Sequence, residues 1–287
     1  MMKKKLPTII FICIFVLGLL ILLYPTISDR WNRRTSSRVI ASYDEALALL
    51  GVEDYSAWWE EAERYNGQIV EKGILSAMTE EDMDTYLSTI DPIGTGMMGY
   101  IDINKIDVHL PIYHTVDEGV LQIAVGHLPE TSLPTGGKGN HIALSGHRGL
   151  PSATLFTDLD ELVEGDLFVL TVLDRVLTYE VDQIRIVNPD EVDDLEMDPQ
   201  EDYCTLITCT PYGVNSHRML VRGHRTSNVE GVTRRLVASD ATAVDTFFVA
   251  TAIAVPVLIA LVIAVFVTTS RKKEPSGEAE EKKNGSE

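Results

Sequence analysis

The sequence predicts a mainly β protein: a closed or nearly closed β-barrel that follows a helical segment and lies between two membrane-spanning helices. Three observations support this fold class. Seven or eight short apolar runs, rich in β-branched residues and separated by turn residues, fall within about 130 residues after Gly94. Residues 30–93 have helical periodicity instead. Long uncharged apolar runs lie near both ends of the chain.

The two apolar runs cover residues 6–23 and 246–269. At about 1.5 Å per helical residue, each can cross a hydrocarbon core about 30 Å thick. The first run could instead be a cleaved signal peptide, but it is longer than the apolar part of such peptides and no clear cleavage site follows it. Basic residues outside both runs favour two cytoplasmic termini and an outward-facing central segment.

This pattern divides the chain into six predicted parts. In order, they are a cytoplasmic start with an anchor (1–29), a helical appendage (30–93), the β-barrel domain (94–230), a linker (231–245), a transmembrane helix (246–269) and a cytoplasmic tail (270–287). The barrel strands are expected at 98–103, 108–114, 141–147, 166–173, 177–187, 203–209 and 218–225. Residues 151–162 read as a short helical crossover between strands.

In the helical appendage, the periodicity runs from Ser37 to about Gln68, and Gly51 is expected to break it into two helices. Thr79, followed by three acidic residues, is a plausible start of a further helix.

The segment between the two apolar runs is strongly acidic, with 38 Asp and Glu against 16 Lys and Arg. Nucleic-acid binding requires the opposite charge, because phosphates are neutralised by basic side chains. The sequence therefore argues against a nucleic-acid partner. Such charge is more often a matter of solubility than of recognition of a basic partner.

Cysteine usage points to a reactive thiol. Cys204 and Cys209 are five residues apart on a predicted strand, so their side chains point to opposite faces and a disulfide between them is not expected. Cys209 closes the strand at a Pro-Tyr-Gly turn and should be exposed at a groove, whereas Cys204 should be an inert buried thiol. A free thiol in an outward-facing domain is most simply explained by reactivity.

A nucleophilic cysteine needs a basic neighbour, and a donor that stabilises the oxyanion of acyl transfer. Among seven histidines, His147 lies at a strand end between two glycines, and His141 on the same strand is its local rival. Arg218 opens the next strand, but Arg222 and Arg225 compete with it, and the spacing does not choose between them. The His and Cys spacings match no zinc pattern, so neither a metal nor another cofactor is expected.

Four segments carry a family resemblance. Residues 205–225 (TLITCTPYGVNSHRMLVRGHR) resemble the signature of sortases, and residues 141–160 (HIALSGHRGLPSATLFTDLD) resemble the histidine segment of class C, or pilin-polymerising, sortases. Residues 98–114 and 126–137 resemble the opening strands of the same class. The resemblance implies an eight-stranded sortase barrel with catalytic Cys209, His147 and Arg218, which selects Arg218 over Arg222.

The resemblance also implies a reaction and its partners. Cys209 would attack the Thr–Gly bond of an LPXTG-like sorting signal, and the thioacyl-enzyme would be released by an amine, for pilin sortases a pilin lysine. Expected partners are pilins or surface proteins with such signals, the lipid bilayer and a cell-wall precursor. The expected location is the membrane of a Gram-positive-type bacterium, with the catalytic domain outside.

Three other functions were weighed against this interpretation, and the first two remain open. The first is a sortase that attaches surface proteins to a peptidoglycan amine. The second is a membrane-anchored module that binds peptides without catalysis. The third, a membrane assembly protein acting through its spans, finds no support because neither apolar run contains an ionisable residue.

One feature departs from the class C pattern. Its members usually carry an Asp-Pro-aromatic lid motif on an N-terminal loop, and residues 70–85 contain none. Asp91-Pro92-Ile93 is the nearest match, but it directly precedes the first barrel strand, where a turn is the favoured interpretation over a lid.

Overall fold

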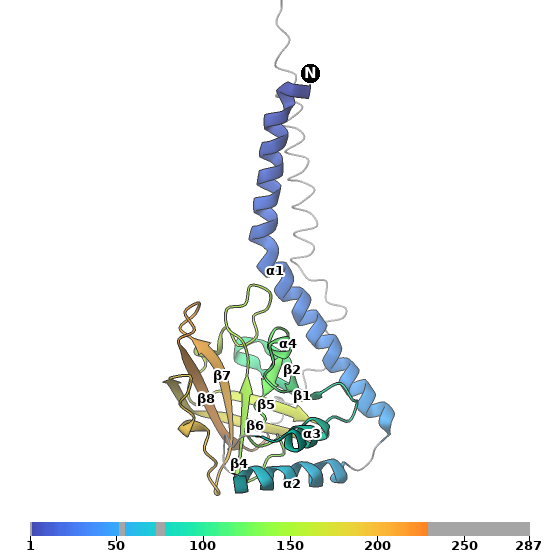
Figure 1. The fold of residues 1–287 in the computed structure, drawn as a ribbon, viewed down its shortest axis with the longest axis vertical. Coiled ribbons are helices and arrows are strands. Elements are labelled where there is room, and N and C mark those ends of the chain that lie inside the picture. Colours follow the sequence, from blue (N-terminus) through green and yellow to red (C-terminus); the bar gives the residue numbers. More distant parts are fainter. Residues whose placement is uncertain (1, 52–54, 73–77, 229–287) are drawn as a thin grey trace, which may run out of the picture. The chain divides into compact units, whose positions relative to one another are not determined.

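The computed structural model describes residues 2–51, 55–72 and 78–228, and within them eight strands close into a barrel (Figure 1). The order around the barrel is β1-β2-β3-β4-β7-β8-β6-β5. The strands are β1 (Met97–Ile103), β2 (Val108–His114), β3 (Val125–His127), β4 (Asn140–Ser145), β5 (Leu167–Val172), β6 (Arg175–Val187), β7 (Asp202–Thr210) and β8 (His217–Thr226). The predicted mainly β, closed barrel is confirmed.

The helices lie mostly before the barrel in sequence. They are α1 (Met2–Leu50), α2 (Ser56–Lys72), α3 (Glu80–Ser88) and α4 (Glu118–Leu121), with 3-10 turns η1 (Asn104–Ile106), η2 (Leu159–Glu161) and η3 (Asp193–Leu195). The barrel belongs to a compact unit that begins at Leu23, within α1. The predicted linker, second span and tail (231–287) lie outside the described residues.

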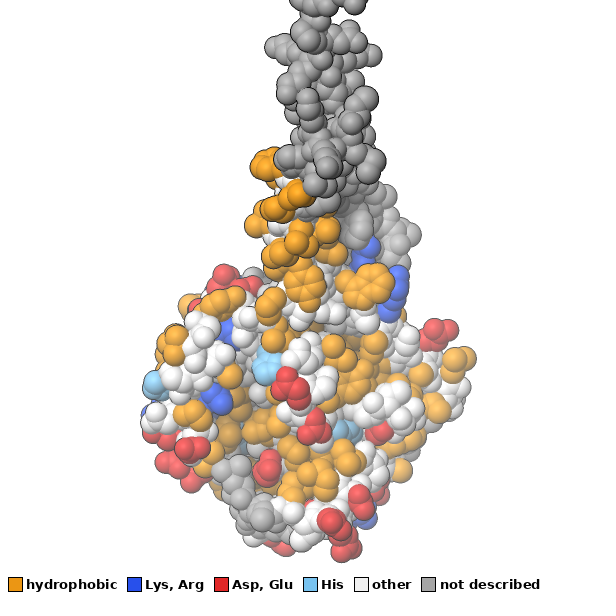
Figure 2. All heavy atoms as spheres, turned by 45° about the horizontal axis from the view of Figure 1, so that its top comes forward, with side chains coloured by type: hydrophobic (Ala, Val, Ile, Leu, Met, Phe, Trp, Pro, Cys, Tyr) orange, Lys and Arg blue, Asp and Glu red, His pale blue; other side chains and the backbone are white. Residues whose placement is uncertain are grey.

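Helix α1 is long and apolar enough, from Ile10 onward, to cross a membrane, as the first apolar run predicts from its length and composition. Its apolar side chains between Ile10 and Tyr24 are largely exposed, and hydrophobic atoms cover this part of the helix in Figure 2. The helix continues without a break through residue 29 to Leu50. The anchor and the first part of the appendage are therefore one helix.

The start and stop signals of the appendage are confirmed. Gly51 follows α1 with a φ of +59°, a left-handed conformation that glycine adopts without strain. Thr79 caps α3, because its hydroxyl accepts a hydrogen bond from the backbone of Asp82 and the Asp82 carboxylate accepts one from the Thr79 backbone. Asp91 accepts hydrogen bonds from the N–H groups of Thr95 and Gly96, so the favoured turn interpretation holds.

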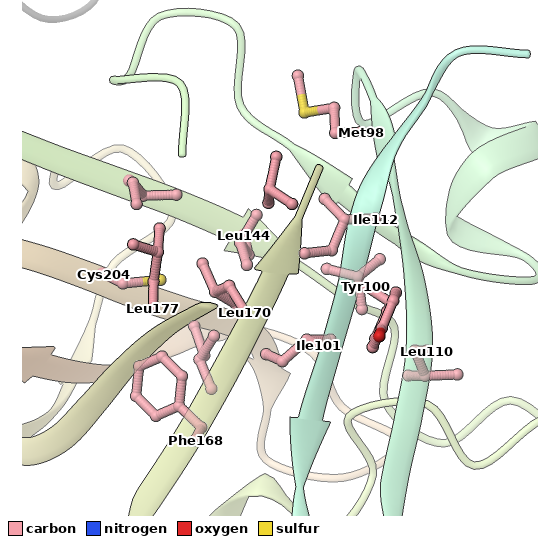
Figure 3. Packing of buried hydrophobic residues seen from close by; sticks show 14 of the residues in the cluster. Met98, Tyr100, Ile101, Leu110, Ile112, Leu144, Phe168, Leu170, Leu177 and Cys204 are labelled. Atoms are coloured by element: carbon pink, nitrogen blue, oxygen red, sulfur yellow. The ribbon is translucent and has the colours of Figure 1, made fainter. Parts of the chain in front are cut away.

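Packing inside the barrel follows from strand alternation. Side chains of β1, β2, β4, β5 and β7 meet in one apolar cluster, and Figure 3 shows Ile101, Ile112, Leu144 and Leu170 within it. Alternate residues of β4, β7 and β8 point to the other face of the sheet. There, Ala143, Ile207 and Leu220 form a second, smaller cluster with Val187 and Leu195.

Three sequence-based expectations need correction. Residues 151–162 form turns with a single 3-10 segment at their end, because His147, Gly149 and Thr154 tie this stretch into a folded loop in place of a helix. Strand β4 ends at Ser145 instead of residue 147. The short β3 was not among the predicted strands, since three residues are too few to show periodicity.

Candidate functional site

The site predicted from the sequence lies at the end of β7. Strands β7 and β8 are antiparallel, and Cys209 is the direct register partner of Arg218. Cys209 is two residues from Ile207, and Arg218 is two residues from Leu220. Because side chains alternate along a strand, both point to the face of the sheet that carries the smaller apolar cluster. Both side chains are partly exposed.

His147 reaches this place from the neighbouring strand. Strand β4 runs parallel to β7, with Ser145 paired to Ile207. Two hydrogen bonds continue the pairing by one residue: the Gly146 N–H donates to the Ile207 carbonyl (3.0 Å), and the Thr208 hydroxyl donates to the Gly146 carbonyl (2.8 Å). If the same register continued by one more residue, His147 would lie opposite Cys209.

Two glycines, Gly146 and Gly149, allow the backbone around His147 to pack closely against aromatic rings. A Cβ on Gly146 would lie 2.6 Å from the Phe156 ring, so only glycine fits between β7 and that ring. Gly149 has a φ of +77°, and a Cβ there would lie 3.1 Å from the Tyr212 ring. The sequence pattern of glycines around His147 therefore reflects close packing of its loop against Phe156 and against the β7–β8 connection.

The two cysteines have different surroundings. Cys204 is fully buried in the main apolar cluster (Figure 3), and this burial raises the pKa of its thiol well above the usual value. Cys209 is half-buried at the strand end. Both are free thiols, as the spacing predicts. Of these two, Cys209 is the thiol that a substrate can reach.

The rival histidine is engaged in the structure. The ring of His141 contacts the Glu196 carbonyl (2.9 Å) and the Thr205 hydroxyl (2.7 Å), and burial lowers its pKa. By contrast, the ring of His147 makes no hydrogen bond with any part of the chain that the structure describes, and it is partly exposed. Of the two histidines, His147 is therefore the one whose ring is accessible to a ligand.

The three arginines of β8 differ in the same way. Arg222 forms two hydrogen bonds with the Asp182 carboxylate (3.0 and 2.9 Å) and lies over the Tyr203 ring. Arg225 donates to the carbonyls of Thr178 and Val176. Within the described ranges, Arg218 makes only two side-chain hydrogen bonds, both to nearby backbone carbonyls in or beside its own turn. Of the three, Arg218 is the one whose guanidinium pairs with no carboxylate in the described part of the chain, whereas Arg222 pairs with Asp182 and Arg225 lies 3.9 Å from Asp202.

Two further residues border the site without having been singled out from the sequence. Arg148 follows His147, pairs with Asp160 and has its guanidinium carbon 6.0 Å from the centre of the Tyr212 ring. Tyr212 itself is 61% exposed. A basic residue after the histidine and an aromatic one after the cysteine were visible in the sequence, but their contact depends on two loops meeting in space. No cluster of three or more His, Cys, Asp or Glu suited to a metal occurs among the described residues.

Comparisons with known proteins identify the family of this barrel. Residues 101–226 match the family model described as the sortase domain. The crystal structure of sortase C1 from Streptococcus agalactiae is similar over its whole length, with 47% identity, 67% of this chain covered and a TM-score of 0.65. The chain belongs to the sortase family.

Two other sortases show how similar this chain is to further members of the family. Sortase C-1 from Actinomyces oris is 44% identical over 60% of this chain and 99% of that one, with a TM-score of 0.56. Sortase D of Bacillus subtilis is 31% identical over 130 residues, which are 44% of this chain and 63% of that protein. The match thus spans less than two thirds of that curated relative. Class C sortases are among the most similar structures, whereas the curated relatives carry the names sortase A, D and SrtE1.

Proposed function

We propose that this protein is a cysteine transpeptidase in which Cys209 is the nucleophile, His147 the proton carrier and Arg218 the stabiliser of the oxyanion. The observation that carries the proposal is the register: Cys209 pairs directly with Arg218 across β7 and β8, and the β4–β7 pairing leads His147 to the same strand end. Within the described residues, the Cys209 thiol and the His147 ring make no hydrogen bond, and the Arg218 guanidinium donates only to backbone carbonyls.

In the first half of the reaction, the Cys209 sulfur attacks the carbonyl carbon of the threonine in an LPXTG-like sorting signal. The tetrahedral intermediate carries a negative oxygen, which the Arg218 guanidinium stabilises by donating hydrogen bonds. The C–N bond to glycine breaks, and His147 gives its proton to the departing amine. A thioester between Cys209 and threonine remains.

In the second half, an amine attacks the thioester carbonyl. His147 accepts the proton that the amine loses, and the C–S bond breaks to return the Cys209 thiolate. Atoms and charge balance whether the resting pair is thiolate with imidazolium or thiol with neutral imidazole. The similarity to class C structures favours a pilin lysine as the acceptor amine, and therefore pilus polymerisation as the role.

The proposed setting is the outer face of a Gram-positive-type membrane. Helix α1 provides the anchor by its length and composition. Pilins or surface proteins that bear the sorting signal would meet the enzyme at this membrane.

The test is to identify the acylated amine. The full-length chain in lipid nanodiscs would be incubated with an LPXTG peptide and three acceptors in parallel: a lysine-bearing pilin, a peptidoglycan precursor amine and water. We expect a thioacyl adduct on Cys209 in intact-mass spectra and an isopeptide bond to the pilin lysine. An adduct resolved by the peptidoglycan amine alone would assign the protein to wall anchoring. Absence of any adduct on Cys209 would refute the transpeptidase mechanism.

A further inference from the structure

Helix α1 is hydrogen-bonded to the loop that carries His147. One carboxylate oxygen of Asp29 accepts two hydrogen bonds from Thr154, one from its backbone N–H (2.7 Å) and one from its hydroxyl (2.6 Å). One turn further along the helix, the Asn32 amide donates to the Ser152 carbonyl (2.7 Å). These contacts join residues about 120 positions apart in sequence, within the same compact unit.

The other Asp29 oxygen is also held. Arg33, one turn along α1, pairs with it at 3.0 Å, and the Arg33 guanidinium also pairs with Asp107 at 2.7 Å. The Asp29 side chain is only 24% exposed. Arg33 therefore fixes the orientation of the Asp29 carboxylate, whose other oxygen binds Thr154.

From Thr154 the hydrogen bonds continue to the histidine. The Thr154 carbonyl accepts from the Thr157 N–H (2.8 Å), and the Thr157 hydroxyl accepts from the Gly149 N–H (3.1 Å). In the same loop, the Phe156 N–H donates to the His147 carbonyl (3.1 Å). The backbone of His147 and of Gly149, two residues after it, is thus attached to the segment that Asp29 holds.

The loop has little regular structure of its own. Between the end of β4 at Ser145 and η2 at Leu159 it consists of turns with one isolated bridge, between Leu150 and Ala153. Leu155 adopts a φ of +44°, which is unfavourable for a residue with a side chain. Such a backbone keeps its conformation only when surrounding contacts impose it, and Asp29 and Asn32 supply contacts from outside the barrel.

We propose that Asp29 and Asn32 are positioning residues for catalysis, which hold the His147 loop through Thr154 and Ser152 and make the juxtamembrane part of α1 a component of the active site. The inference rests on the proposed role of His147 and extends it. Misplacing a reacting group by about 1 Å costs on the order of 10²-fold in rate. The anchor helix would then serve the chemistry as well as attachment to the membrane.

The experiment uses the full-length protein in nanodiscs and four variants. Asp29→Ala and Asn32→Ala remove the contacts, Asp29→Asn keeps an oxygen acceptor for Thr154, and Glu45→Ala is the matched control, an exposed acidic residue on the same helix. We expect Asp29→Ala to lower kcat about 10- to 100-fold with KM changed less than twofold. Asp29→Asn should recover most of the rate, and Glu45→Ala should match the parent.

A second measurement separates this inference from the transpeptidase mechanism itself. Hydrogen exchange of residues 146–157 needs no turnover. We expect Asp29→Ala to speed exchange in this loop about tenfold, with the melting temperature of the barrel unchanged. Unchanged exchange in Asp29→Ala would overturn the inference, as would faster exchange accompanied by a normal kcat. An inactive parent enzyme would instead refute the transpeptidase proposal, while the exchange result would still decide whether α1 holds the loop.

Discussion

Two polar regions of this barrel differ in how completely their side chains are hydrogen-bonded. At the end of β7, Cys209, His147 and Arg218 are partly exposed, and the His147 ring has no partner within the described residues. Beneath α3, Tyr86 and His127 are fully buried, with the Tyr86 hydroxyl 3.0 Å from one ring nitrogen of His127 and the Ser132 carbonyl 2.8 Å from the other.

The comparison shows that a histidine in this barrel can either stabilise the interior or remain available for chemistry. A buried ring must have its nitrogens satisfied, because an unpaired polar group in the interior costs about 1–3 kcal/mol. Such a ring contributes to stability and cannot exchange protons easily. A ring at a strand end, left without partners by the fold, costs little because water solvates it, and it remains available for chemistry. Three predictions, each comparing two substitutions, test this distinction.

The largest effect is expected at the site thiol. Cys209→Ala should lower acyl transfer from an LPXTG peptide by at least about 10³-fold, because no other described group at the strand end can form the thioester. Steady-state turnover and intact-mass detection of the acyl-enzyme measure this. Cys204→Ala is the matched control on the same strand. For Cys204→Ala we expect the acyl-enzyme still to form, but the protein to be less stable because the substitution leaves a cavity in the core.

The second effect compares two arginines on one strand. Arg218→Ala should lower kcat about 10²- to 10³-fold with little change in the free energy of unfolding, since it removes a donor to the oxyanion and leaves no buried partner unpaired. Arg222→Ala should lower kcat less than tenfold but destabilise the protein by about 1–3 kcal/mol, since Asp182 loses both its hydrogen bonds. Kinetics and urea unfolding of the two variants would measure both quantities. Equal losses of kcat would remove the distinction between them.

The smallest effect on activity, and a clear one on stability, is expected in the buried cluster. Burial lowers the pKa of His127 to about 3, whereas an unfolded histidine titrates near 6.5. Between these values the unfolded state binds a proton that the folded state does not. Stability should therefore fall as the pH drops from about 6.5 towards 3, by up to about 1.4 kcal/mol per pH unit for this group.

Denaturant unfolding at a series of pH values tests this expectation. His127→Phe should be less stable at pH 7 but lose less stability on acidification, because the titrating group is gone. His224→Gln, which removes a more exposed ring, should retain the parent's slope. A slope unchanged in His127→Phe would show that other groups, such as the buried His141, carry the pH dependence.

Local patterns in the sequence were sufficient for much of the fold. Strand alternation located seven of the eight strands, Gly51 and Thr79 located helix ends, and the five-residue spacing of Cys204 and Cys209 separated their faces. These features depend on residues close together in the chain, which adopt the same conformation wherever the segment lies. The helix expected at 151–162 is wrong because the conformation of this loop is set by hydrogen bonds with His147, Gly149 and α1, which its own periodicity cannot reveal.

Apolar alternation and turn residues were enough to predict a cysteine, a histidine and an arginine at strand ends of a barrel, and the family resemblance named Cys209, His147 and Arg218. The pairing of polar groups could be seen only in the folded protein, where Arg222 pairs with Asp182, His141 with Thr205, and Thr154 of the His147 loop with Asp29. The partners in these pairs lie between 40 and 125 residues apart in the chain, so no local pattern relates them. Which donors remain free for a substrate is therefore fixed only when the barrel closes and α1 packs against it.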